Sequence, residues 1–163
     1  PVVAAVAGAA VGIGTTLLLH CDLVYCADNA KFSLPFAQLG LCPEFASSYL
    51  LAQIAGYPRA AEKLMLGEAF SAQEALDMGL VSRVLPVDEL HAHAMAQAAK
   101  LAALPATSVR ETKRLMRAGQ AQAVATAMAD ENKLFSTMLT APEAKEAFTA
   151  FFEKRKPDFA QFS

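Results

Sequence analysis

Residues 2–34, VVAAVAGAAVGIGTTLLLHCDLVYCADNAKFSL, give the strongest indication of the fold class of this chain. Its first part is short and apolar and is bounded by Pro1 and Gly8, which is typical of a buried strand. In chain order the stretch predicts a strand at 2–7, a glycine turn at 8–14, a helix at 15–21, and strands at 23–27 and 31–34. This strand–helix–strand order predicts an α/β fold with parallel strand pairing.

The remainder of the chain has a mainly helical pattern. Pro43 suits the first position of a helix that runs to about Ile54, which would place Glu44 in its first turn. Ser71 and Glu74 have the spacing of a capping box at the start of a short helix. Further helices are predicted at 58–66, 88–103, 106–118, 121–139 and 142–154, with one strand at 80–85. We therefore expect one domain, with an α/β core at 1–86 and a helical region at 87–163.

The composition argues against several classes of protein. With 163 residues, 55% hydrophobic and 18% charged, the chain is long and apolar enough for a folded core. Its net charge of −2 argues against nucleic-acid binding, and its apolar stretches are interrupted well short of a membrane span of ~20 residues. Three cysteines without a Cys-x-x-Cys pair predict buried thiols in a reducing compartment, not disulfides or a zinc site.

Two places in the sequence could carry chemistry. Glu44 is a lone carboxylate among apolar residues, and its spacing alone favours a structural acid that complements a helix dipole. The turn from Gly8 to Gly14 matches no dinucleotide fingerprint, since Leu17 stands where the third glycine would be, and it lacks the ending of a P-loop. Such a turn can still present a backbone N–H to a developing anion.

Other polar residues give weaker signals. His91 and His93 lie two residues apart on a predicted helix and do not share a face, so they predict no metal site. His20 is expected to be a hydrogen-bonded core residue. The basic cluster at 154–156 is either a solvated helix end or a phosphate contact.

Several motifs together resemble the crotonase superfamily, whose members act on acyl-CoA thioesters. They are the glycine-turn region at 3–14, HCDLVY at 20–25, AKFSLP at 30–35, LGLCP at 39–43, GEAFSAQEALDMGLV at 67–81 and EKRKPDF at 153–159. The resemblance covers essentially the whole chain. It implies the crotonase (ClpP-like) ββα spiral core, followed by a helical C-terminal trimerisation region.

The resemblance also indicates a reaction. Enoyl-CoA hydratases use two carboxylates, at positions that correspond here to Thr16 and Phe36, and both carboxylates are absent. A carboxylate stands instead at Glu44, where hydratases typically have glycine, as in Δ3,Δ2-enoyl-CoA isomerases. The resemblance thus implies that Glu44 moves a proton from C2 to C4 of a 3-enoyl-CoA, giving 2-enoyl-CoA. The alternatives are another acyl-CoA reaction of the superfamily, or a non-catalytic module that binds CoA or a protein.

Further site residues follow from the same resemblance. The N–H of Ile13 is expected to hold the dienolate oxygen, so Glu44 and Ile13 are the predicted catalytic residues. Phe36 and Leu39 are expected to line a dry pocket that excludes competing water. The predicted substrate-binding residues are Gly12, Gly14, Pro35, Phe36, Leu39, Pro43 and Lys154. Coenzyme A belongs to the substrate, and no separate cofactor or metal is expected.

The resemblance also leads to expectations beyond the site. Family members carry an N-terminal region that supplies a second oxyanion donor and much of the CoA contact, so without it the site is expected to be half built. Crotonases form trimers, often paired as hexamers, and the aromatic stripe of Phe148, Phe151 and Phe152 fits packing on a neighbouring subunit. A cytoplasmic location is expected in a bacterium and a peroxisomal one in a eukaryote, with no nucleic-acid or membrane partner.

Overall fold

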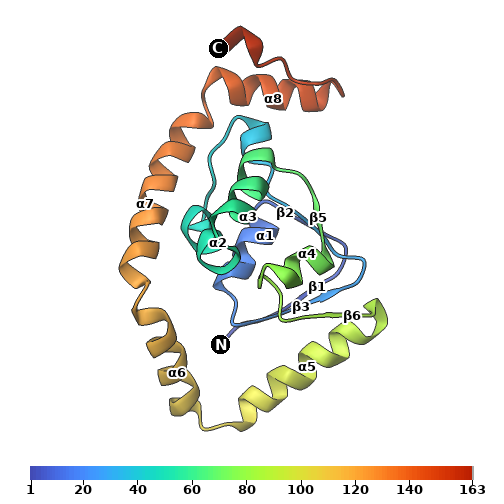
Figure 1. Ribbon diagram of the computed structural model, residues 1–163, viewed down its shortest axis with the longest axis vertical. Coiled ribbons are helices and arrows are strands. Elements are labelled where there is room, and N and C mark those ends of the chain that lie inside the picture. The colour runs from blue at the N-terminus through green and yellow to red at the C-terminus, as the bar shows by residue number, and fades with distance from the viewer. Residues whose placement is uncertain (163) are drawn as a thin grey trace.

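The computed structural model describes residues 1–162 and contains two small sheets surrounded by helices (Figure 1). The first sheet has the order β1 (Val3–Val6), β3 (Leu23–Ala27) and β6 (Arg83–Leu85), and its strands are parallel. The second has the order β2 (Ala9–Val11), β4 (Lys31–Ser33) and β5 (Phe70–Ser71), with β5 antiparallel to β4. The predicted α/β class with parallel pairing is confirmed.

Each pass of the chain contributes one strand to each sheet. β1 leads through Gly8 into β2, and β3 leads through a turn at 28–30 into β4, so that Val3 pairs with Leu23 and Ala9 pairs with Lys31. Helix α1 (Ile13–Thr16) and the 3₁₀ helix η1 (Leu17–His20) lie between the two passes. Two strand pairs separated by helix are successive turns of a ββα spiral, as the resemblance implied.

The middle of the chain adds short helices and the aromatic core. These helices are η2 (Ala37–Leu39), α2 (Ser47–Ala55), α3 (Tyr57–Ala61), the π-helical turn η3 (Glu62–Leu66) and α4 (Ala72–Asp77). Phe32 and Phe70 are fully buried on neighbouring strands, with ring centroids 5.6 Å apart. The predicted capping box is confirmed, because Ser71 and Glu74 each accept a hydrogen bond from the other's backbone N–H.

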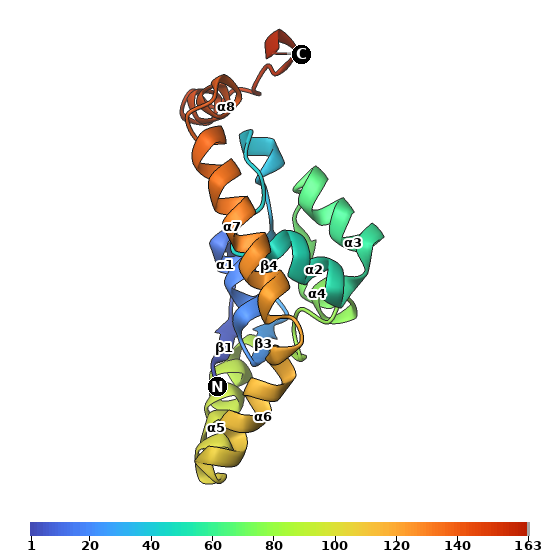
Figure 2. The ribbon, with the colours of Figure 1, turned by 90° about the vertical axis from the view of Figure 1, so that its left-hand side faces the viewer.

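The last four long helices form an arc around the α/β core (Figures 1 and 2). They are α5 (Val87–Ala103), α6 (Ala106–Ala118), α7 (Ala121–Met138) and α8 (Pro142–Phe152), followed by the 3₁₀ turn η4 (Ala160–Phe162). Leu90 and Ala94 of α5 pack on Tyr25 and Ala27 of the first sheet. α7 lies beside α2, and α8 lies against η2, so the arc touches the core close to the Glu44 loop.

The structure corrects several predicted boundaries. The glycine turn contains strand β2, the helix predicted at 15–21 spans 13–20, and only Arg83–Leu85 of the predicted strand at 80–85 is extended. β5 was not predicted, because two residues are too few to produce an alternating pattern. Pairing with strands distant in sequence defines these short elements. Within residues 1–162, no helix is long and apolar enough to cross a membrane.

Candidate active site

Glu44 lies in a loop and not in a helix, so the predicted helix start at Pro43 is wrong. Phe45 and Ala46 both adopt left-handed backbone conformations, with φ of 59° and 57°, and α2 begins only at Ser47. Two successive residues in this conformation cannot belong to a right-handed helix. The main-chain carbonyl of Glu44 accepts hydrogen bonds from the N–H and the hydroxyl of Ser47, at 3.1 and 2.6 Å. The main chain of Glu44 therefore forms part of the turn that leads from the loop into α2.

The carboxylate of Glu44 is held by Thr16 at the end of α1. Thr16 is completely buried, and its hydroxyl donates to Oε1 of Glu44 at 2.5 Å. This is the position at which the resemblance places one of the two hydratase carboxylates. The residue there thus acts as a hydrogen-bond donor to Glu44.

The glycine turn brings a backbone donor to the same place. Gly12 has φ 55° and ψ −118°, values typical of the first central residue of a type II′ turn, and its N–H donates to the carbonyl of Ser33 at 3.0 Å. Its carbonyl accepts from the N–H groups of Thr15 and Thr16. Ile13 is the first residue of α1, a position whose N–H has no partner within the helix. Such an N–H carries partial positive charge and suits an anionic oxygen.

Glu44 and Ile13 line one pocket of about 460 Å³. The residues that line it are Ile13, Phe36, Glu44, Asn132, Phe135 and Ser136. The structure thus brings together three of the residues predicted for the site, Ile13, Phe36 and Glu44. Among the described residues that line the pocket, Glu44 has the only ionisable side chain.

Sequence reasoning missed the wall that α7 contributes to this pocket. The wall consists of Asn132, Phe135 and Ser136, which follow Glu131 on this helix. Glu131 itself is buried and accepts hydrogen bonds from the N–H of Ala46 and from the N–H and hydroxyl of Ser48. A signal was available for Glu131. It lies seven residues after Val124 and four before Phe135, so it is an acidic residue on the apolar stripe of a predicted helix.

Other predicted substrate residues lie outside the pocket. Leu39 is half-buried, packs against the hydrophobic core and is not among the residues that line the pocket with Phe36. Pro43 lines a separate apolar pocket of about 390 Å³ together with residues of α2, α3 and η3. Three further predicted residues are next to lining residues in the sequence but do not line the pocket themselves: Gly12 and Gly14 beside Ile13, and Pro35 beside Phe36.

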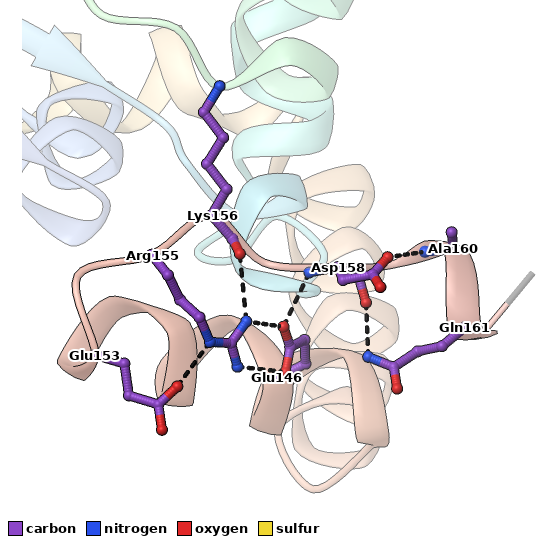
Figure 3. A network of polar contacts seen from close by, with 7 residues as sticks. All are labelled: Glu146, Glu153, Arg155, Lys156, Asp158, Ala160 and Gln161. Carbon is purple, nitrogen blue, oxygen red and sulfur yellow. Dashed lines mark hydrogen bonds and ion pairs between the residues drawn. The ribbon is translucent and has the colours of Figure 1, made fainter.

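The basic cluster at 154–156 lies beyond the end of α8, where Lys154 has φ 55°. Arg155 is paired with the carboxylates of Glu146 and Glu153, and Glu146 also accepts from the N–H of Asp158 (Figure 3). Arg155, followed by the Asp158 amide, lowers the pKa of Glu146 to about 2. Arg155 is thus occupied in fastening the C-terminal segment to α8, whereas the side chain of Lys156 points away from this network (Figure 3).

The histidines and cysteines take structural positions. His20 is half-buried and hydrogen-bonded to the carbonyl of Phe45 at 2.7 Å, which confirms the hydrogen bond expected of it. Residues 1–162 contain no group of histidine, cysteine or acidic side chains that could hold a metal ion. The cysteines in these residues are free thiols, and burial raises the pKa of Cys26 to about 11. Cys26 is fully buried, whereas Cys21 and Cys42 are only half-buried.

Comparison with known proteins defines the family. The family model described as enoyl-CoA hydratase/isomerase matches residues 1–162, and the chain belongs to this family. It is 35% identical over 159 residues to 2,3-dehydroadipyl-CoA hydratase of Escherichia coli K12, covering 98% of this chain and 62% of the relative. The chain therefore spans somewhat less than two thirds of the curated relatives it matches.

Solved structures establish the crotonase fold. The structure of an enoyl-CoA hydratase/isomerase from Pseudoalteromonas atlantica T6c matches with a TM-score of 0.94 and 43% identity, over 98% of this chain and 64% of the other. Pseudomonas aeruginosa OdaA matches with a TM-score of 0.89 and 47% identity, over 93% of this chain and 62% of the other. The spiral of strand pairs described above is thus the crotonase core.

Proposed function

We propose that the protein is an acyl-CoA isomerase that shifts the double bond of a 3-enoyl-CoA to the conjugated 2-position. The observation that carries this proposal is the pocket that Glu44 lines together with Ile13, the first residue of α1. One base and one backbone donor are the equipment needed to move a proton beside a thioester carbonyl.

In the proposed reaction Glu44 removes a proton from C2, which the thioester makes acidic. The electron pair of that C–H bond moves toward the carbonyl, and the Ile13 N–H stabilises the resulting dienolate oxygen. Glu44 then returns the proton to C4 as the C2–C3 double bond forms. No atom is gained or lost. The Thr16 hydroxyl holds Oε1 and leaves Oε2 to carry the proton.

Hydration is the competing reaction, because several relatives are named as hydratases. By the resemblance, that reaction needs two carboxylates to hold and activate water. Thr16 and Phe36 stand at the corresponding positions, and the aromatic ring of Phe36 lines the pocket. Among the described residues that line the pocket, Glu44 has no second ionisable side chain beside it, which favours proton transfer between carbons over addition of water.

The family likeness further suggests how the substrate is held. We propose an acyl-CoA thioester as substrate, with coenzyme A part of it, and Lys154 as a contact for the CoA phosphates. We also propose assembly as a trimer or hexamer. Phe151 and Phe152 expose 72% and 79% of their surface on α8, and such exposure of large aromatic side chains is typical of an interface.

Substitution of Glu44 tests the isomerase proposal directly. Glu44→Gln keeps the shape of the side chain and its acceptor for the Thr16 hydroxyl but removes the base. We expect the rate of 3-enoyl-CoA conversion to fall about 10²- to 10⁴-fold, as for loss of a general base. Glu68→Gln changes an exposed carboxylate and serves as the matched control.

Product analysis separates the proposed reaction from its competitors. Liquid chromatography with mass spectrometry distinguishes the isomer, which has the mass of the substrate, from a hydrated product. Isomer formation by the unsubstituted protein and its loss in Glu44→Gln support the proposal. Hydrated product alone, or undiminished isomerisation by Glu44→Gln, would overturn it.

A further inference from the structure

We infer that Glu131 is a positioning residue for the Glu44 base, an inference that rests on the proposed function of Glu44. Glu131 is an acidic residue on α7 with only 6% of its surface exposed. It takes no part in the proposed proton transfer. A buried carboxylate is costly unless its oxygens accept hydrogen bonds, so its partners indicate what it is for.

All three donors to its carboxylate come from the start of α2. Oε2 accepts from the N–H of Ala46 at 2.5 Å, and Oε1 accepts from the N–H of Ser48 at 3.0 Å and from its hydroxyl at 2.5 Å. The carbonyl of Glu131 also lies 3.7 Å from the Cys42 thiol. Glu131 therefore contacts the chain two residues before Glu44 and two residues after it.

The loop between these contacts needs such support. Phe45 and Ala46 have φ of 59° and 57° without being glycine, a conformation that is disfavoured for residues with a Cβ. The cap position of α2 is Ala46, which supplies no side-chain cap hydrogen bond. Glu131 replaces that missing cap from a distant segment, and its negative charge suits the amino-terminal end of a helix. The turn that directs Glu44 toward Thr16 is thus fixed by a residue on another helix.

The same helix forms one wall of the pocket. Asn132, Phe135 and Ser136 of α7 line the pocket beside Glu44. Glu131 therefore joins the loop that carries the base to the helix that forms this wall, and its hydrogen bonds help to set the distance between them. Because a misplacement of about 1 Å can reduce a rate on the order of 10²-fold, the contact governs catalysis without touching the substrate.

Glu131→Gln tests the inference, because an amide cannot reproduce these contacts. Glutamine has one acceptor oxygen and one NH₂ group, so in either orientation a donor faces the N–H of Ala46 or of Ser48. We expect kcat for 3-enoyl-CoA isomerisation to fall about 10- to 100-fold with KM unchanged, since the substrate contacts remain. Asp130→Asn changes the exposed neighbouring acid on α7 and is expected to retain the original kcat.

Amide hydrogen exchange provides a readout that does not depend on activity. In Glu131→Gln we expect faster exchange at Ala46 and Ser48, while the Leu51 amide, deeper in α2, keeps its protection. This pattern supports the positioning role even if the unsubstituted protein proves not to isomerise 3-enoyl-CoA. In that case the proposed function is wrong, but the role of Glu131 in holding the loop at residues 45–48 is still supported.

Two results would overturn the inference. The first is unchanged kcat together with unchanged exchange at Ala46 and Ser48. The second is general loss of protection throughout α2, with the melting temperature falling in parallel, which would show a purely structural role. If Glu131→Gln does not fold, Ser48→Ala removes only the hydroxyl contact. A smaller fall in kcat at constant KM in that variant supports the inference, and an unchanged kcat contradicts it.

Discussion

The conformation of Gly12 allows a quantitative prediction about the turn that presents the Ile13 N–H. Gly12→Ala places a Cβ where no heavy atom lies within 4 Å, so the substitution introduces no clash. Its effect must come from the backbone, because φ 55° with ψ −118° is disfavoured for alanine. Holding a non-glycine residue in such a region costs on the order of 1–3 kcal/mol.

Gly14→Ala is the matched comparison two residues away. Gly14 has no positive φ, and an added Cβ would make an ordinary contact with the Ala10 Cβ at 3.8 Å. Both substitutions restrict the unfolded chain to a similar extent, which stabilises the protein by about 0.4–1 kcal/mol where the native backbone suits alanine. The difference between the two variants therefore isolates the backbone cost at Gly12. We expect Gly12→Ala to be about 1–3 kcal/mol less stable than Gly14→Ala.

Urea denaturation followed by circular dichroism measures this difference. If the main chain at residue 12 relaxes to relieve the strain, it turns the Ile13 N–H away from the pocket, and we expect the isomerisation rate of Gly12→Ala to fall as well. Removal of one oxyanion donor lowers kcat by about 10²- to 10³-fold in other enzymes. Equal unfolding free energies for the two variants would refute the reasoning, because they would show that the turn does not require glycine.

Two further predictions concern stability and the attachment of α8. The Ser71 backbone N–H, together with Lys63, lowers the pKa of Glu74 from 4.5 to about 2, so its stabilising contribution is fully present above pH 4.5 and is lost as the pH falls toward 2. We expect Glu74→Gln to reduce the unfolding free energy by under about 1 kcal/mol at neutral pH, because the side chain is half exposed, and to make no difference once the pH lies well below the folded pKa of about 2, as measured by urea titrations at several pH values. Gly40 has φ 65°, and an added Cβ would lie 2.8 Å from the Ala144 nitrogen, so Gly40→Ala should push the start of α8 away from η2. Faster amide exchange at Ala147 and Ala150 would support this, and unchanged exchange would contradict it.

Much of the architecture could be read from local patterns. Strand 23–27 and helix 106–118 have the predicted bounds, and the Ser71–Glu74 capping box forms as expected. These elements depend on hydrophobic periodicity and on side chains close in sequence, which is information that the chain carries locally. The short strands β2 and β5 do not depend on local patterns, because pairing with β4 defines each of them as a strand.

Motifs and local patterns were sufficient to identify a crotonase-like α/β chain with Glu44 as the candidate base and a glycine turn that can supply an N–H donor. The way in which that base is held depends on packing between distant segments. Local preference placed Glu44 in the first turn of a helix, because Pro43 suits such a position. Contacts with Glu131 instead hold Phe45 and Ala46 in left-handed conformations, and a buried hydroxyl on Thr16 meets the carboxylate. Such contacts join segments far apart in the chain, so their geometry becomes defined only once the helices have packed.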